Sequence, residues 1–468
     1  MRIGIIGGGI SGLMAAYRLS SSKDNEIVIF EQGHSLQNRK CPILDGKTPR
    51  CLKCTNCSIM EGFGGAGAFS DGKYNITTEF GGWLQDIVGE EKTLQYIESA
   101  DEILVKFGAT IDRFMPNDEL KRRCLEVDLH MLQSQCKHLG TDANYQTMSN
   151  FIYHLTMNIS NLKLMRLCKV TNVLLNYYNN QHLIVYDNNG NNSESNSETF
   201  DVIIFATGRV GSGFFANWCE ENNIKLKNNQ VDIGVRVELP ALVWEEFEKK
   251  IYEPKIFYRT KIYGDVCRMF CFNGRGEVVI ENSNGVLSVN GHAYKAEEKK
   301  TKNTNFALLS TVNFTHPFNQ PIEYAKHIAS LANMISGGSV IVQRLGDLER
   351  GRRTDESRLA KSTVKPTLKS AVAGDLSLCI PKRQLDNIVE TLHALDKIAH
   401  GTANEDTLLY GVECKYYSAR PYTNDSFEME DAPRCYAIGD GAGFTRSLAQ
   451  AGAQGLMVAD AILNKKFS

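Results

Sequence analysis

The chain has 468 residues, of which 42% are hydrophobic and 23% charged, and its formal net charge is -2. This length predicts two or three domains, and the near-neutral charge argues against a dedicated non-specific nucleic-acid binder. No run approaches the roughly 18 apolar residues that a membrane span needs. Thirteen cysteines, several of them in apolar runs, fit a reducing compartment, so we expect a cytoplasmic protein without a membrane partner.

The N-terminus follows the strand–glycine–helix pattern of a dinucleotide site. Residues 2–6 form a short apolar run, Gly7, Gly9 and Gly12 stand at its end, and a helical pattern follows over 13–20. The first glycine permits a tight turn, the second a close backbone approach to a pyrophosphate, and the third close packing of helix on strand. The pattern therefore predicts a bound dinucleotide.

A second predicted strand, over residues 26–30, delivers Glu31. An acidic residue at this place accepts a hydrogen bond from a ribose hydroxyl, while the helix N-terminus offers unpaired N–H groups to the phosphates. We also assign Ile10 and Ser11, at the start of that helix, to the cofactor site.

A glycine-rich turn near the C-terminus favours FAD over NAD. It follows a predicted strand over residues 435–438 and opens a terminal helix, so Asp440 can accept hydrogen bonds from a polyol such as ribityl. The helix N-terminus behind it can stabilise negative charge on a reduced flavin ring. The cofactor contacts assigned to this turn are Gly439, Asp440, Gly441 and Gly443.

A third close backbone approach is expected where the predicted strand over residues 201–205 ends in Ala206, Thr207 and Gly208. The predicted site is built from both chain ends, and the sequence between them changes to longer β-like runs, so we expect a discontinuous domain. We predict an α/β fold in which residues 1–222 and 405–468 form a Rossmann-like FAD-binding domain. Residues 223–404 form an inserted substrate domain with a mixed β-sheet.

The remaining pattern assigns secondary structure more coarsely. Residues 84–160 are rich in helical patterns, and residues 187–199, which carry no apolar side chain, are expected to be an exposed hairpin loop. Strands are expected over 162–170, 173–178, 182–186, 231–238, 255–263, 268–272, 278–280 and 306–314. Helices are expected over 322–335 and 383–400, and His292 is expected in a turn.

Further motifs span nearly the whole chain. They include Gly7 to Gly12, Cys41-Pro42, Cys51-x-x-Cys54-x-x-Cys57, Gly64-Gly-Ala-Gly-Ala-Phe-Ser-Asp-Gly-Lys73, Asp232-Ile-Gly-Val-Arg-Val-Glu238, Gly351-Arg-Arg-Thr354 and Gly439 to Gly443. In these motifs the chain resembles the FAD-dependent dehydrogenases, a family of NAD(P)/FAD-dependent oxidoreductases with a glutathione-reductase-like FAD domain. The resemblance implies bound FAD and redox chemistry. The further cofactor contacts assigned with it are Gly65, Ser70, Asp71, Gly72, Lys73 and Val170.

Two departures from the family pattern prevent the transfer of a substrate. After Cys271 the family tends to continue with a second cysteine, a proline and paired glycines, whereas this chain reads Phe-Asn-Gly-Arg-Gly over 272–276. After Gly443 the usual glycine-rich approach is replaced by Phe-Thr-Arg-Ser-Leu over 444–448. Both segments are expected near the flavin or the substrate.

The cysteines at the N-terminal side of the second glycine-rich run leave three alternatives open. Cys51, Cys54 and Cys57 have the spacing of iron–sulfur ligands, and Cys41 could supply a fourth thiolate to a cluster or zinc, favoured by the nearby Lys40, Arg50 and Lys53. The other two readings are a loop of structural thiols and a redox pair that exchanges electrons with FAD. A bound metal is the less favoured reading.

Four residues are candidates for catalysis: Cys271, Arg268, Asp71 and Lys73. Cys271 and Arg268 lie on a β-like run that could face the flavin, although an ordinary strand cysteine is the simpler interpretation of Cys271. A basic segment holds Arg350, Arg352 and Arg353, which form either a clamp for an anionic substrate or a solvated face of internal ion pairs.

The sequence thus predicts an FAD-dependent oxidoreductase that moves a hydride between flavin N5 and a small, unidentified substrate. NAD(P)H is expected as a transient donor at most, because no second Gly-x-Gly-x-x-Gly is present. Two alternatives stay open: a tRNA-modifying flavoprotein, indicated by the basic segment, and a flavin and thiol electron-relay or sensor protein with an electron-transfer partner.

Overall fold

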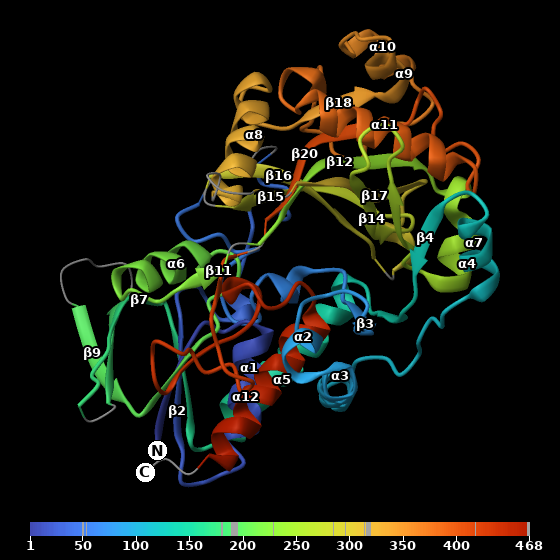
Figure 1. Cartoon of the computed structure of the whole chain (residues 1–468). Helices are drawn as coiled ribbons and strands as arrows, with labels where there is room; N and C mark the ends of the chain where they lie inside the picture. Colours follow the sequence, from blue (N-terminus) through green and yellow to red (C-terminus); the bar gives the residue numbers. More distant parts are fainter. Residues whose placement is uncertain are drawn as a thin grey trace.

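The structure is a computed structural model that describes residues 1–48, 51–52, 54–178, 181–188, 195–227, 229–283, 285–294, 296–312, 314, 320–416 and 418–465. The chain forms two lobes, and the N-terminus lies beside the end of helix α12 (Leu448–Asn464) at the outer end of the lower lobe (Figure 1). Among the described residues no helix is both long and apolar enough to cross a membrane.

The lower lobe is built on a five-stranded sheet in the order β22-β10-β1-β2-β6, in which every neighbouring pair is parallel. Its strands are β1 (Arg2–Ile6), β2 (Glu26–Glu31), β6 (Leu162–Arg166), β10 (Val202–Phe205) and β22 (Cys435–Ala437). The central strands are almost wholly buried, as parallel strands covered on both faces are. Because β22 pairs with β10, both ends of the chain build one sheet, as the sequence predicts.

Helices and a small second sheet cover the parallel sheet. On one face α1 packs against α12, which also packs against α3, and α5 contacts β6. On the other face, rings of the antiparallel sheet β7-β8-β9 pack on Phe30 of β2. The helices and strands of the lower lobe outside the parallel sheet are α1 (Ile10–Leu19), α2 (Gln85–Val88), α3 (Glu90–Lys106), α5 (Thr141–Met157), α6 (Ser212–Glu221), β3 (Lys73–Ile76), β5 (Gln135–His138), β7 (Cys168–Leu174), β8 (His182–Asn188) and β9 (Ser195–Phe200).

The upper lobe holds an eight-stranded mixed sheet in the order β19-β18-β20-β12-β17-β14-β13-β4 (Figure 1). Its strands are β4 (Leu129–Leu132), β12 (Val231–Pro240), β13 (Lys255–Arg259), β14 (Val266–Asn273), β17 (Asn303–Val312), β18 (Ile341–Arg344), β19 (Val372–Ala373) and β20 (Leu408–Tyr416). The hairpin β15 (Glu277–Ser283) and β16 (Val286–His292) packs beside it. Its helices are α4 (Asp118–Leu125), α7 (Glu245–Ile251), α8 (Pro321–Ile335), α9 (Leu345–Glu349), α10 (Glu356–Lys361) and α11 (Lys382–Asp396).

The α/β fold class predicted from the sequence is confirmed, while several local predictions are corrected. The strand expected over 162–170 is two strands, β6 and β7, separated at Leu167, whose φ of +55° breaks the extended run. Residues 195–199 of the expected loop belong to β9, an exposed edge strand held by backbone pairing with β8 rather than by apolar burial; residues 189–194 lie outside the described part. His292 ends strand β16 instead of sitting in a turn.

The strand pairing refines the domain division that we propose. Strand β20 pairs with β12 and β18 in the upper sheet, although it begins three residues beyond the predicted boundary at 405. Strand β4 pairs with β13 at the other edge of the same sheet, although it comes from the first segment of the chain. We therefore propose a second boundary after β20 and a crossing of β4 into the upper lobe.

Candidate functional site

A cavity of about 940 Å³ lies between the glycine-rich turns of the lower lobe and strands β13, β14 and β20 of the upper sheet. Ligand sites are clefts of roughly 300–1,000 Å³, so this cavity lies in the upper part of that range. The predicted cofactor residues that line it are Gly7, Gly9, Ile10, Ser11, Glu31, Gly65, Ser70, Asp71, Lys73, Val170, Ala206, Thr207, Gly208 and Asp440. The predicted cofactor residues that are not among its lining residues are Gly12, Gly72, Gly439, Gly441 and Gly443.

The three N-terminal glycines have separate structural tasks. Gly7 has a φ of +113°, and a Cβ there would stand 2.2 Å from the carbonyl oxygen of Ala206. A Cβ on Gly12 would stand 2.3 Å from the carbonyl oxygen of Gly7, so this glycine lets α1 pack closely. A Cβ on Gly9 would meet open space, and Gly9 caps α1 without a side-chain hydrogen bond. The free helix N-terminus at Gly9 therefore faces a space that can take a phosphate.

Glu31 binds the backbone of two turns at the edge of the cavity. Its Oε2 accepts from the N–H of Gly8 at 2.8 Å, and its Oε1 accepts from the N–H groups of Gly33 and Gly62 at 2.9 Å each. The carboxylate is 7% exposed. Glu31 thus fixes the two glycine-rich segments relative to each other, in addition to its predicted role toward a ribose.

Arg39 is a site residue that the sequence gave no reason to single out. Its guanidinium is buried and donates to the carbonyls of Ser58 at 2.8 Å, Ile59 at 2.7 Å and Gly65 at 2.8 Å. Burial lowers the pKa of Arg39 to about 10 despite the nearby Glu31 carboxylate. Arg39 therefore holds the backbone from residue 58 to 65 in place, and no motif marks such a role.

Two further observations show that the residues present fit FAD. Thr207 lines the cavity, and its Oγ1 is buried without a hydrogen-bond partner among the described residues. Asp440 also lines the cavity and accepts from the Thr445 hydroxyl at 2.7 Å. Burial raises the pKa of Asp440, although the nearby Arg209 works in the opposite direction. Both strand ends thus offer polar atoms to a dinucleotide at the carboxyl edge of the parallel sheet.

Asp71 and Lys73 form a buried ion pair that faces the upper lobe. Lys73 Nζ lies 2.9 Å from Asp71 Oδ2 and 3.7 Å from Glu253 Oε1, and it also donates to the carbonyl of Phe272. Burial opposes both charges, yet the two carboxylates raise the pKa of Lys73, and Lys73 with His138 lowers the pKa of Asp71. The lower lobe therefore presents a fixed ion pair to strand β14.

Cys271 stands opposite this ion pair on a bulge of β14. Its φ is +53°, the β14–β17 register shifts between Phe270 and Asn273, and the residue lines the cavity. Arg236, wholly buried, donates from Nη2 to the Cys271 carbonyl at 3.1 Å and lies 3.5 Å from its Sγ. Arg236 Nη1 lies 3.5 Å from Glu413 Oε2, which compensates the buried charge. Arg236, paired with Glu413, thus holds the backbone of Cys271 in place through a buried hydrogen bond.

A second charged group lines the same cavity beside β15. Glu281 lies 3.0 Å from Arg209 Nη1 and 3.7 Å from Lys415 Nζ, and it accepts from Asn290 at 2.7 Å. Burial alone would raise the pKa of Glu281, but Arg209 and Lys415 outweigh it and lower the pKa to about 2. Arg268 also lines the cavity, and the Gln230 amide is the group that lies within hydrogen-bond distance of its guanidinium. Arg268 can therefore receive an anionic group in this cavity.

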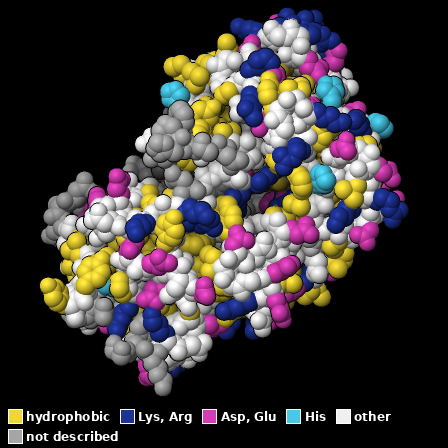
Figure 2. All heavy atoms as spheres, viewed as in Figure 1, with side chains coloured by type: hydrophobic (Ala, Val, Ile, Leu, Met, Phe, Trp, Pro, Cys, Tyr) yellow, Lys and Arg dark blue, Asp and Glu magenta, His cyan; other side chains and the backbone are white. Residues whose placement is uncertain are grey.

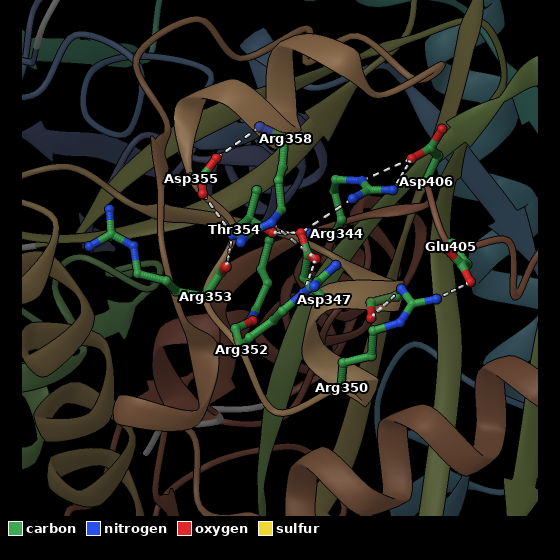
Figure 3. A network of polar contacts seen from close by, with 12 residues as sticks. Arg344, Asp347, Arg350, Arg352, Arg353, Thr354, Asp355, Arg358, Glu405 and Asp406 are labelled. Atoms are coloured by element: carbon green, nitrogen blue, oxygen red, sulfur yellow. Dashed lines mark hydrogen bonds and ion pairs between the residues drawn. The ribbon is translucent and has the colours of Figure 1, made fainter.

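The arginines predicted as a substrate clamp lie elsewhere, around α9 and α10, which stand at the outer end of the upper lobe (Figure 1), and Figure 3 shows their polar contacts. Arg352 Nε lies 2.8 Å from the buried Asp347, Arg350 pairs with Glu405, and Arg353 is exposed. None of the three lines the cavity. Figure 2 shows dark-blue side chains at this end, but those labelled in Figure 3 are mostly paired with acidic residues. The geometry favours the alternative of a solvated face with internal ion pairs.

The described cysteines of the predicted cluster lie in different surroundings, although Cys41 is near enough to Cys57 to contribute to the raised pKa of its thiol. Cys51 lies beside the β15–β16 hairpin, where its Sγ is 3.5 Å from Asn282 Nδ2, while Cys54 is exposed. Cys57 is half-buried, and burial raises the pKa of its thiol, which disfavours a thiolate. Arg50 and Lys53 lie outside the described residues. Within the described part, no group of three or more His, Cys, Asp or Glu side chains is arranged to hold a metal ion.

Comparisons with known proteins match two segments of the chain. Residues 231–416 match the family described as FAD-dependent protein, C-terminal domain-like, and residues 5–36 match the NAD(P)-binding Rossmann-like domain. An uncharacterized protein of Clostridium beijerinckii is 25% identical over 488 residues, which cover 98% of this chain and 80% of that protein.

Two solved structures also match the chain, both with TM-scores below 0.5. Glycine oxidase from Geobacillus kaustophilus is 11% identical with a TM-score of 0.42, over 100% of this chain and 96% of that one. L-proline dehydrogenase from P. horikoshii is 12% identical with a TM-score of 0.42, over 98% of this chain and 92% of that one.

The Rossmann-like sheet, the cavity at its carboxyl edge and the two matched segments define the class of this protein: an FAD-dependent oxidoreductase. The predicted resemblance to FAD-dependent dehydrogenases and the predicted cofactor, FAD, are confirmed at this level.

Proposed function

We propose that the protein exchanges a hydride between flavin N5 and a small polar substrate bound where the lower lobe meets strand β14. The observation that carries the proposal is the contact of Lys73 with the Phe272 carbonyl, because it joins the glycine-rich run of the lower lobe to the strand that holds Cys271. Lys73 and Cys271 line one cavity, so a ligand there contacts both lobes.

Bound FAD would supply the two-electron chemistry, while the chain supplies orientation, exclusion of water and proton handling. Gly7 to Ser11 and Glu31 are the residues that would hold the adenosine and pyrophosphate part, and Asp440 would hold the polyol part. The N-terminus of α1 favours the negative phosphates.

On the substrate side, Arg268 offers a cation for an anionic group. When the Gln230 amide is oriented with its oxygen toward Arg268, that oxygen accepts from the guanidinium at 3.2 Å. Asp71 and Lys73 form a fixed ion pair beside the same space, and Cys271 lies across from them. This arrangement supports a small carboxylate that carries an oxidisable or reducible bond as the substrate class.

The test is anaerobic reduction of the purified flavoprotein by a panel of amino acids, hydroxy acids and unsaturated acids, with NADPH alone as a separate trial. We expect one acid class to bleach the flavin or to reoxidise its reduced form. An Arg268→Gln variant should raise KM for that class, whereas Arg352→Gln, far from the cavity, should leave KM unchanged. A flavin that no small molecule reduces or reoxidises, but that exchanges electrons with a protein, would support an electron relay instead.

A further inference from the structure

The segment over residues 444–448, one of the two places where the sequence departs from the family pattern, pairs with a loop of the lower lobe. The N–H of Trp83 donates to the carbonyl of Phe444 at 3.0 Å, and the N–H of Arg446 donates to the carbonyl of Gly81 at 2.8 Å. These two bonds make a short antiparallel bridge between the loop and the segment. Both line the cavity, so the bridge fixes this part of its wall.

The bridge places Arg446 over the side chain of Trp83. Arg446 Cζ lies 3.8 Å from the centroid of the Trp83 ring, within the range in which the face of an aromatic ring attracts a cation. Both side chains are half-buried, and both line the cavity. A guanidinium that stacks on a ring keeps its N–H groups at its edge, where they bind a carboxylate or phosphate with two parallel hydrogen bonds. Trp83 thus holds Arg446 as a cation of the cavity wall.

A second arginine contacts the same ring. Arg420 Cζ lies 4.6 Å from the centroid of the Trp83 ring, although Arg420 is not among the lining residues of the cavity. Its stem fits beside Gly443, where a Cβ would stand 2.7 Å from Arg420 Cγ. Burial lowers the pKa of Arg420 more than the nearby Asp86 raises it. The charge of Arg420 is therefore only partly compensated by the protein, and it adds to the positive potential at Trp83.

The same loop holds a third cation, which comes from the upper lobe. Lys255, on β13, places its Nζ 3.8 Å from the centroid of the Phe80 ring, and both side chains line the cavity. Lys255 also lies 3.7 Å from Glu253, a carboxylate that it shares with Lys73. Phe80 and Trp83 belong to one short stretch of chain. The loop therefore gathers a cation from each lobe at one part of the cavity wall.

We propose that Arg446 and Lys255 form an oxyanion site, which binds a carboxylate or phosphate group of the substrate or of the hydride donor. Arg446 takes the group with its guanidinium fork, and Lys255 adds a point charge from the other lobe. Trp83 and Arg420 are positioning residues that act through Arg446. Arg268 lies on another strand of the cavity wall, so a ligand with two acid groups has a cation for each. The inference rests on the proposed function and extends it to such a ligand.

Trp83 reports binding directly, because the other two tryptophans of the chain, Trp218 and Trp244, are buried in the cores of the two lobes. The holoprotein is titrated with inorganic phosphate at constant ionic strength. Tryptophan fluorescence and flavin absorbance are followed, and Trp83→Phe serves as the blank for the fluorescence. We expect a saturable change in the wild type. A wild type in which neither signal shows a saturable change would overturn the proposal.

Variants of the two cations test the site itself. Arg446→Gln should weaken phosphate binding by at least about tenfold, because it removes charge-assisted hydrogen bonds. Arg446→Lys keeps the charge without the fork, so it should restore only part of the affinity. Arg166→Gln, at an exposed position on β6, should bind phosphate as the wild type does. If Arg446→Gln purifies without flavin, Lys255→Met carries the same expectation. A flavin-loaded variant of either cation with wild-type affinity would overturn the oxyanion site.

Two comparisons distinguish the sources of the bound group. Tighter binding of succinate than of acetate, by an advantage that Arg268→Gln removes, supports a second carboxylate of the substrate. Tighter binding of NADPH than of NADH, by an advantage that Arg446→Gln removes, supports a phosphate of the donor. Equal affinities within both pairs would overturn the assignment to substrate or donor. A protein that binds phosphate as expected, but whose flavin no small molecule reduces or reoxidises, would instead contradict the proposed function.

Discussion

Lys73 Nζ lies 2.9 Å from Asp71 Oδ2 at a point where both side chains are almost completely buried. Removing one partner of such a pair leaves an uncompensated charge, which costs about 3–5 kcal/mol. We therefore expect Lys73→Met to lower the free energy of unfolding by about that amount in urea denaturation. Lys47→Met, which removes the exposed partner of Asp45, should cause no measurable change. Equal stability of the two variants would contradict the buried pair.

The lowered pKa of Glu281 predicts that the free energy of unfolding decreases in acid. Its pKa falls from 4.5 to about 2 in the folded protein, so its contribution is present above pH 4.5 and is lost as pH falls toward 2. A shift of this size corresponds to roughly 3 kcal/mol. We expect Glu281→Gln to be less stable than the wild type at pH 6 and the difference to shrink steadily below pH 4.5. The exposed Glu323→Gln serves as control, and a difference that does not change with pH would refute the assignment.

Substitutions at Gly9 and Gly7 should affect different properties, FAD binding and stability respectively. A Cβ at Gly9 meets open space in the cavity, so Gly9→Leu should fold normally but weaken FAD binding by at least about a hundredfold. Gly7→Ala combines a φ of +113° with a 2.2 Å approach to Ala206, so it should destabilise the apoprotein itself. Flavin retention on a gel-filtration column and thermal unfolding of the apoproteins separate the two. Gly213→Ala, in open space on α6, should change neither.

Arg352 should matter for stability and not for redox chemistry. Asp347 is wholly buried and accepts from both Arg352 at 2.8 Å and Thr354 at 2.9 Å. Arg352→Glu places a like charge beside it, so we expect a clear fall in the free energy of unfolding with unchanged flavin content and unchanged reduction rate. A rise in KM for the substrate in this variant would restore the clamp interpretation.

The local part of the fold could be predicted from the sequence because glycine positions and apolar runs report backbone geometry directly. The turn at Gly7, Gly9 and Gly12 and the pairing of both chain ends in one sheet are of this kind. The boundary after β20 and the crossing of β4 could not be predicted, since strand partners far apart in the chain leave no local pattern.

The candidate site could likewise be predicted only as far as local sequence patterns reach. The sequence singled out Asp71, Lys73 and Cys271 individually, and the structure brings them to one cavity. The residues that complete the site are Arg39, Glu253, Glu281 and Glu413. Each acts through a partner many positions away, and a buried charge is recognisable only when its partner is known. The arginines at 350, 352 and 353 show the converse limit, because a basic run leaves both an anion site and internal ion pairs open until its acidic neighbours are known.

The central claim is that this cavity holds FAD through the Gly9 turn. The most direct test is the absorption spectrum of the purified protein, with the released cofactor identified by mass, for the wild type and for Gly9→Leu. The account predicts one FAD per wild-type chain and a folded variant without flavin. A folded wild-type protein that cannot bind FAD, or a Gly9→Leu variant that binds it as tightly as the wild type, would contradict it.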